Sequence, residues 1–160
     1  MSVTVTQVTE RDIPWVNQVF EQYWGGDFVV SRGRKHFPAD LKGFYATDPH
    51  GSRCGLVTYR VEGTECEVVT LNAFTQLAGI GSALVDAIKD WAIRARCTRL
   101  WLITTNDNLD AIRFYQRREF KLVKVHAGAI EISRKLKPSI PLVGNFGIPL
   151  NDELEFELRL

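Results

Sequence analysis

The spacing of apolar residues changes along the chain and divides it into helical and extended segments. Val3, Val5 and Val8 lie among polar residues and predict a short first strand. Residues 11–24 carry apolar side chains at helical spacing, with Thr9 or Asp12 at the start and Gly25-Gly26 at the end, and predict a helix. Residues 27–42 follow neither period, and we interpret them as a loop with a short helical piece.

Three strand-like runs follow, over 44–47, 55–61 and 65–71. The first break, Asp48-Pro49-His50-Gly51, and the second, Glu62-Gly63, are both typical of turns. Because the second break is short enough for a hairpin, we expect three antiparallel strands in a meander.

In the second half of the chain, segments with the helical spacing of apolar residues alternate with strand-like segments. This half predicts helices over 79–96 and 108–117 and strands over 99–105 and 120–126. The run at 99–105 is almost continuously apolar, so we expect that strand to be covered on both faces. Residues 137–151 are rich in proline and glycine yet still apolar, and 154–160 alternate like a half-buried final strand that completes the sheet. The pattern indicates one mixed α/β domain over 1–160.

Composition and charge exclude several classes of protein. Hydrophobic residues make up 45% of the chain and charged residues 24%, which is typical of a soluble globular domain. The net charge of +1 argues against nucleic-acid binding, and no apolar run approaches the ~20 residues that span a bilayer. The N-terminal residues do not resemble a signal peptide. We therefore expect a cytoplasmic protein without nucleic-acid or membrane partners.

The three cysteines, Cys54, Cys66 and Cys97, are odd in number and far apart. No Cys-x-x-Cys pair or Cys/His cluster occurs, so the sequence predicts neither a zinc site nor a disulfide framework. We expect these cysteines to be small buried hydrophobic residues, and we expect no bound metal.

The most informative stretch is Gln-Leu-Ala-Gly-Ile-Gly-Ser at 76–82, between a strand and a long helix. Glycines allow close approach to a ligand, and the first amides of a helix lack intrahelical partners, so this turn suits a pyrophosphate. The alternative is that Gly79 and Gly81 only shape a tight turn. A Walker loop needs a lysine after Gly81, and a dinucleotide fingerprint needs a small residue in place of Leu84, so neither motif fits.

Two motifs do match. Gln76, Gly79 and Gly81 fit Gln/Arg-x-x-Gly-x-Gly/Ala, the acetyl-CoA signature of the GNAT family of N-acetyltransferases. Residues 108–120 resemble the second family motif, N-x-x-A-x-x-F-Y-x-x-x-G-F, with Glu119 in place of its glycine. With the order of elements, the resemblance covers nearly the whole chain, and residues 136–150 are similar to the tail of a bacterial GNAT subgroup. It implies a twisted, mostly antiparallel central sheet of six to seven strands flanked by about four helices.

The resemblance also implies how acetyl-CoA binds. Amides from Leu77 to Ser82 would hold the pyrophosphate, and strand residues 71–73 would pair with the pantetheine arm. In the family a bulge separates this strand from 99–105, and an amide there, such as that of Leu71, would polarise the thioester. Asn108 would bind the arm, a role compatible with a simple helix cap, and Arg117 and Arg118 would either reach the 3′-phosphate or lie free on the surface. The predicted cofactor-binding residues are Leu71, Asn72, Ala73, Gln76, Leu77, Ala78, Gly79, Ile80, Gly81, Ser82 and Asn108.

Placed in this motif, Tyr115 is the candidate general acid, because a phenol with a pKa of ~10 is still protonated at neutral pH. The alternative is that Tyr115 is a core aromatic residue.

Glu65 and Glu67 share one face of a strand, and either is a candidate general base, although a solvated strand end explains both equally well. Trp24, Phe28 and His36 are candidate substrate-binding residues, with His36 either a second base or simply solvated.

We therefore expect transfer of an acetyl group from acetyl-CoA to a primary amine of a small molecule or peptide, by direct attack in a ternary complex. The alternative is a catalytically idle acyl-CoA sensor, which would need the glycine turn but not Tyr115. A nucleotide-binding domain of another kind is a third interpretation that depends on the glycine turn alone. The final strand and the apolar tail, if exposed, also suit a homodimer.

Overall fold

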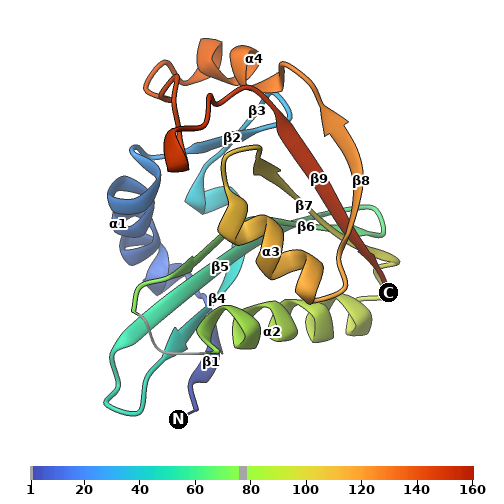
Figure 1. The fold of residues 1–160 in the computed structure, drawn as a ribbon. Helices are drawn as coiled ribbons and strands as arrows, with labels where there is room; N and C mark the ends of the chain where they lie inside the picture. The colour runs from blue at the N-terminus through green and yellow to red at the C-terminus, as the bar shows by residue number, and fades with distance from the viewer. Residues whose placement is uncertain (1, 76–78) are drawn as a thin grey trace.

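The strand-like segments of the sequence form one twisted sheet of seven strands, in the order β1-β4-β5-β6-β7-β9-β8 (Figure 1). The computed structural model describes residues 2–75 and 79–160. The strands of this sheet are β1 (Thr4–Gln7), β4 (Lys42–Thr47), β5 (Arg53–Glu62), β6 (Glu65–Ala73), β7 (Arg99–Thr105), β8 (Lys121–His126) and β9 (Glu153–Arg159). Only the β6–β7 pair is parallel, so the expected mostly antiparallel fold is confirmed.

Helices cover both faces of the sheet (Figure 1). The α-helices are α1 (Ile13–Trp24), α2 (Ile80–Arg94), α3 (Leu109–Arg117) and α4 (Ala129–Leu136), and short 3-10 helices span Glu10–Asp12, Pro38–Asp40 and Asn145–Gly147. One hydrophobic core lies under α2 and α3, and a second lies under α1. Leu56 and Val57, neighbours on β5, belong to different cores because successive side chains of a strand point to opposite faces.

The meander β4–β5–β6 and the first helix form as their sequences predict. The antiparallel pairs follow one another, and α1 ends at Gly25 with a φ of 69°. At the start of the preceding 3-10 helix, the Asp12 carboxylate accepts a hydrogen bond from the Thr9 amide at 2.8 Å. Both polar residues proposed from the sequence therefore take part in starting the helical segment.

The interpretation of 27–42 as a loop is wrong in part. Val29–Ser31 (β2) and Arg34–His36 (β3) form a separate hairpin, and the short helical piece is the 3-10 helix at Pro38–Asp40. The turn uses Arg32 and Gly33, both with positive φ, which suits a two-residue hairpin loop. Three-residue strands are too short to show a period, so the sequence pattern missed them.

Two expectations about the later strands are also corrected. Along β7, Leu100, Leu102 and Thr104 are buried, but the alternate residues are only partly covered, so the strand is not buried on both faces. β9 lies between β7 and β8 and is paired on both sides, so the final strand is not an exposed edge. β8 forms that edge of the sheet.

All three cysteines are buried and free, as expected from their apolar neighbours. Within 2–75 and 79–160, no helix combines the length and the apolar character needed to cross a membrane.

Candidate active site

The two parallel strands at the centre of the sheet pair at one end and separate at the other. Their ladder joins Glu65–Val68 to Arg99–Leu102, whereas β6 continues to Ala73 against β5 alone. The separation begins at a bulge, because Thr58 lies opposite Thr70 while Tyr59 lies opposite Val68. The bulged residue is therefore Val69, which corrects the expectation that Leu71 stands at the bulge. An extended ligand can pair with the strand edge left open beyond it.

A cleft of about 580 Å³ occupies this opening. It brings together six of the predicted site residues, although they lie far apart in the sequence. The predicted residues that line it are Trp24, Leu71, Ala73, Gly81, Asn108 and Tyr115, and the further wall residues include Val69, Ile103, Thr104 and Phe114.

The start of α2 places its first amides at one end of the cleft. Gly79 has a φ of 90°, a conformation that favours glycine, and the first helical bond runs from the Ala83 amide to the Gly79 carbonyl at 2.9 Å. The amides of Ile80, Gly81 and Ser82 come before that bond and lie at the positive end of the helix dipole. Gln76, Leu77 and Ala78, also predicted to bind the cofactor, lie outside the described residues.

Close packing keeps α2 near its neighbours. A methyl group at Gly81 would lie 3.2 Å from Cζ of Phe114 on α3, and one at Gly55 would lie 2.6 Å from Cγ2 of Ile80. The glycines therefore let the amide-bearing end of α2 reach both β5 and α3.

The two predicted asparagines have defined hydrogen bonds. Asn108 caps α3 by accepting a bond from the Ala111 amide at 3.2 Å, so its capping role is confirmed. Asn72 accepts a bond from Nε1 of Trp24 at 2.9 Å, and this bond holds the indole against the end of β6.

Tyr115 is almost completely buried on α3 and lines the cleft. Its ring meets those of Phe114 and Phe120 edge-on. Burial raises the pKa of its phenol above the usual value, so the hydroxyl is fully protonated at neutral pH.

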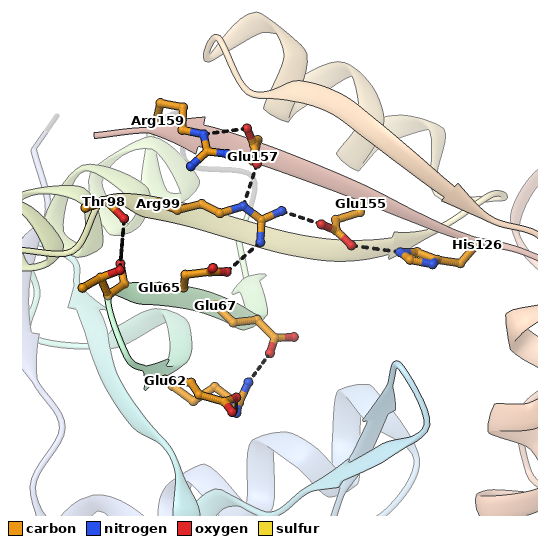
Figure 2. Close-up of polar contacts among 11 residues, drawn as sticks. Glu62, Glu65, Glu67, Thr98, Arg99, His126, Glu155, Glu157 and Arg159 are labelled. Atoms are coloured by element: carbon orange, nitrogen blue, oxygen red, sulfur yellow. Dashed lines mark hydrogen bonds and ion pairs between the residues drawn. The ribbon is translucent and has the colours of Figure 1, made fainter.

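The two candidate bases on β6 have different surroundings, although both side chains leave the strand on one face (Figure 2). The Glu65 side chain is 49% exposed and bonds to Arg99 at 2.9 Å. Glu67 is 3% exposed, accepts a bond from Arg60 at 2.9 Å and lies 3.3 Å from Oγ of Ser31. Burial raises the pKa of the Glu67 carboxyl, although Arg60 opposes this effect.

A second cavity, of about 430 Å³, adjoins the cleft on the side of β2 and α4, and we call it the acceptor cavity. The two spaces share Trp24, Val69, Ile103, Thr104 and Asn108 as wall residues. Trp24 is thus the one predicted substrate-binding residue that lines this cavity.

His36 and Phe28 lie behind the wall of the acceptor cavity. His36 is buried, which contradicts the solvated alternative, and its Nε2 lies 3.1 Å from Oγ of Ser31. Burial, with help from Arg60 and Arg34, lowers its pKa to about 4. Phe28 stacks against Nζ of Lys137 at 5.2 Å.

Sequence reasoning missed four polar residues that line this cavity: Ser31, which is partly buried, and Ser133, Lys137 and Glu153, which are buried. Both carboxylate oxygens of Glu153 accept bonds from the Arg32 amide, at 3.1 and 3.3 Å. In the sequence Glu153 belongs to an alternating strand whose acidic residues are expected to face solvent, and nothing local indicates that α4 and the β2–β3 hairpin cover it.

A further hollow of about 480 Å³, beside the start of α2, contains the predicted Arg117 and Arg118. Ser82, Asp110 and Arg113 also line it, and Arg113 pairs with Asp110 at 3.3 Å. The Arg118 guanidinium lies 4.9 Å from the ring centre of Phe114, which also lines the cleft. Three arginines against one aspartate make this outer hollow positive.

Comparison with known proteins agrees with this architecture. The model of the acetyltransferase (GNAT) family matches residues 15–120. The chain is 40% identical over 139 residues to the uncharacterized protein YdhI of Bacillus subtilis (strain 168), covering 86% of each protein.

Two solved structures share the fold. The IAA acetyltransferase from Bacillus cereus ATCC 14579 superposes with a TM-score of 0.72 at 15% identity, over 99% of this chain and 100% of that one. A GNAT family acetyltransferase from Elizabethkingia anophelis, solved with acetyl-CoA bound, gives 0.71 at 15% identity, over 99% and 98% of the two chains. Because the family model matches more than half of the sequence, this chain belongs to the acetyltransferase (GNAT) family.

Proposed function

We propose that this protein is an N-acetyltransferase that moves the acetyl group of acetyl-CoA to a primary amine within a ternary complex. The observation that carries this proposal is the shared wall between the two cavities, formed by residues such as Trp24 and Thr104. A donor in the cleft and an acceptor in the acceptor cavity would meet there without leaving the protein. Direct attack therefore needs no acyl-enzyme intermediate.

The cleft suits coenzyme A along its whole length. The amides of Ile80–Ser82 would bind the pyrophosphate, and the arginines of the outer hollow would face the 3′-phosphate. The pantetheine arm would pair with 71–73, beyond the end of the β6–β7 ladder. An amide freed by the Val69 bulge would donate to the thioester oxygen.

In the chemical step the amine nitrogen attacks the thioester carbon and the carbon–sulfur bond breaks. Tyr115 gives its proton to the departing thiolate, and solvent later restores it. The attacking nitrogen loses a proton through the Ser31 hydroxyl, which lines the acceptor cavity, to the Glu67 carboxylate 3.3 Å away. We propose Glu67, and not Glu65, as the base because Glu65 points to the Arg99 cluster.

Replacing Tyr115 with Phe tests the acid. We expect turnover to fall at least ~10-fold because the leaving thiolate loses its proton donor, while coenzyme A affinity is kept. The matched control is Tyr59→Phe, which should retain turnover, since the Tyr59 hydroxyl is buried elsewhere in the core and has no hydrogen-bond partner within 2–75 and 79–160. Coenzyme A release in the steady state is the measurement, and normal turnover of Tyr115→Phe would remove this residue from the mechanism.

A comparison of coenzyme A binding with turnover distinguishes the proposed transferase from the alternative, an idle acyl-CoA sensor. Calorimetry would measure coenzyme A binding, and thiol release would be followed with acetyl-CoA and a panel of amines and peptides. Binding without turnover across the panel would favour the sensor. Failure to bind millimolar coenzyme A, with the fold intact, would contradict both.

A further inference from the structure

The acceptor cavity contains a buried ammonium group that lacks a carboxylate partner. Lys137 is 8% exposed, and its Nζ donates to the backbone carbonyls of Trp24 and Phe28, each at 2.6 Å. Over the described part of the chain, no carboxylate forms an ion pair with it; Asp27 and Glu21 act only at longer range. An ammonium has three N–H donors, so one remains after these two bonds.

A second unused donor lies one helical turn away. Ser133 is 1% exposed, and its hydroxyl has no hydrogen-bond partner among the described residues, although it lines the same cavity. The Lys137 amide donates to the Ser133 carbonyl at 2.9 Å, so the two residues follow one another along the same side of α4. A buried hydroxyl without a partner destabilises the folded protein, which makes a ligand acceptor favourable here.

The other buried charge of the cavity is already compensated within the protein. Glu153 accepts two bonds from the Arg32 amide, and the Arg32 guanidinium lies 3.6 Å away. Of these two charges, the one without a charged side-chain partner among the described residues is therefore the positive one, although two backbone carbonyls solvate it. Buried charges in proteins are normally paired, and Lys137 faces a space that a ligand can fill.

The rest of the wall of the acceptor cavity indicates the size and polarity of the rest of the ligand. It is mainly apolar, with Val29, Ile103, Ile130 and Leu150 among its residues, and the volume of about 430 Å³ is in the range of small-molecule sites. The main chain of a polypeptide carries no anionic group near its reacting N-terminus, whereas every free amino acid carries a carboxylate there.

We infer that Lys137 and Ser133 form a carboxylate-binding subsite, and that the acceptor is a small aminocarboxylate with an apolar body. This inference rests on the proposed acetyl transfer into the acceptor cavity. The carboxylate binds at α4, and the amine lies toward the wall shared with the cofactor cleft. Lys137 and Ser133 thus select the substrate and hold it, while Glu67 and Tyr115 act on protons.

The test compares ligands that differ only in the carboxylate. The protein, saturated with coenzyme A, is titrated by calorimetry with the common amino acids and with 4- to 6-carbon ω-amino acids. Matched amines without the carboxylate include isopentylamine for leucine, phenethylamine for phenylalanine and butylamine for 5-aminopentanoate. We expect at least one aminocarboxylate to bind ~10-fold or more tightly than its matched amine.

The variant Ser133→Ala tests whether the Ser133 hydroxyl contributes to this carboxylate preference. It removes a hydroxyl that has no protein partner, so the fold should be unaffected, and it should reduce the carboxylate preference about 10-fold. Lys137→Met should abolish the preference, with circular dichroism to check that the end of α1 remains folded. Equal binding of acids and amines, or an unchanged preference in Ser133→Ala, would overturn the subsite.

Activity separates this inference from the proposed function. A carboxylate preference in binding without any acetylation supports the subsite and contradicts the transferase. Acetylation of amines with no carboxylate preference supports the transferase and contradicts the subsite.

Discussion

Three polar residues form a hydrogen-bonded chain at the wall of the acceptor cavity: Ser31, which is partly buried and lines the cavity, and the buried His36 and Glu67. Oγ of Ser31 lies 3.1 Å from Nε2 of His36 and 3.3 Å from Oε2 of Glu67. With its pKa lowered to about 4, His36 is neutral at physiological pH and cannot supply a charge. The ionisable base of this chain is therefore Glu67, and Arg60 stabilises its ionised form.

The pH dependence of the reaction should follow Glu67. Only the ionised carboxylate accepts a proton, and burial raises its pKa, so kcat/KM should fall as the pH decreases through that raised value. Glu67→Gln should lose about 100-fold in turnover at neutral pH and should also lose this acidic limb.

Glu65→Gln is the control, because Glu65 belongs to the Arg99 cluster and should leave the acidic limb in place. The pH–rate profiles of both variants and the wild type are the measurement. An acidic limb that persists unchanged in Glu67→Gln would exclude this residue as the base.

At the scale of elements, the end of α3 explains how the chain tolerates Glu119 where the family motif has glycine. Glu119 has a φ of 71°, and its amide bonds to the Gln116 carbonyl while the Phe120 amide bonds to that of Tyr115, each at 3.0 Å. These two bonds form a Schellman motif, and the Tyr115 and Phe120 rings make its hydrophobic contact. The turn geometry is kept, but a residue with a side chain occupies the left-handed position.

Glu119→Gly should therefore stabilise the protein by about 1 kcal/mol, because glycine adopts this conformation without steric strain. Glu119→Ala keeps the strain and should show no comparable gain. The free energy of unfolding from denaturant titration is the measurement. A loss of stability in Glu119→Gly would show that the glutamate side chain contributes more than the strain removes.

At the scale of the whole molecule, Arg99 joins three strands at the closed end of the β6–β7 pair (Figure 2). Its guanidinium pairs with Glu65 on β6 and with Glu155 and Glu157 on β9, at 2.9 Å to Glu65 and 2.6 Å to Glu157. Glu155 also lies 2.9 Å from His126 on β8. The cluster ties four strands together opposite the end where the cleft opens.

Arg99→Met should destabilise the protein by about 3 kcal/mol, because it removes the cation that pairs with Glu155 and Glu157 together, and both carboxylates are largely buried. The matched control is Arg159→Met, since Arg159 is exposed and, among the described residues, pairs with Glu157 alone, at 3.0 Å; its effect should stay below ~1 kcal/mol. Thermal unfolding of both variants is the measurement, and equal effects would contradict a clamping role for Arg99.

Much of the fold follows from local patterns. The sequence predicted the strands at 99–105 and 120–126, the helices around them and the meander. These elements were predictable because the spacing of apolar residues and the turn residues between elements are both local in the sequence. The β2–β3 hairpin and α4 were not predicted: the hairpin strands are too short to show a period, and α4 follows the predicted strand at 120–126 without a signal that we recognised. These two elements build the acceptor cavity, so its polar residues were missed with them.

The sequence by itself determined the order of the longer helices and strands, the family and the positions of the two cofactor motifs, since each depends on residues close together in the chain. Only the tertiary structure separated Glu65 from Glu67, which share a strand face but differ in what packs over them. It alone brought Ser31, Ser133 and Glu153 around one cavity. Burial and charge pairing depend on contacts between distant segments, and no local pattern records them.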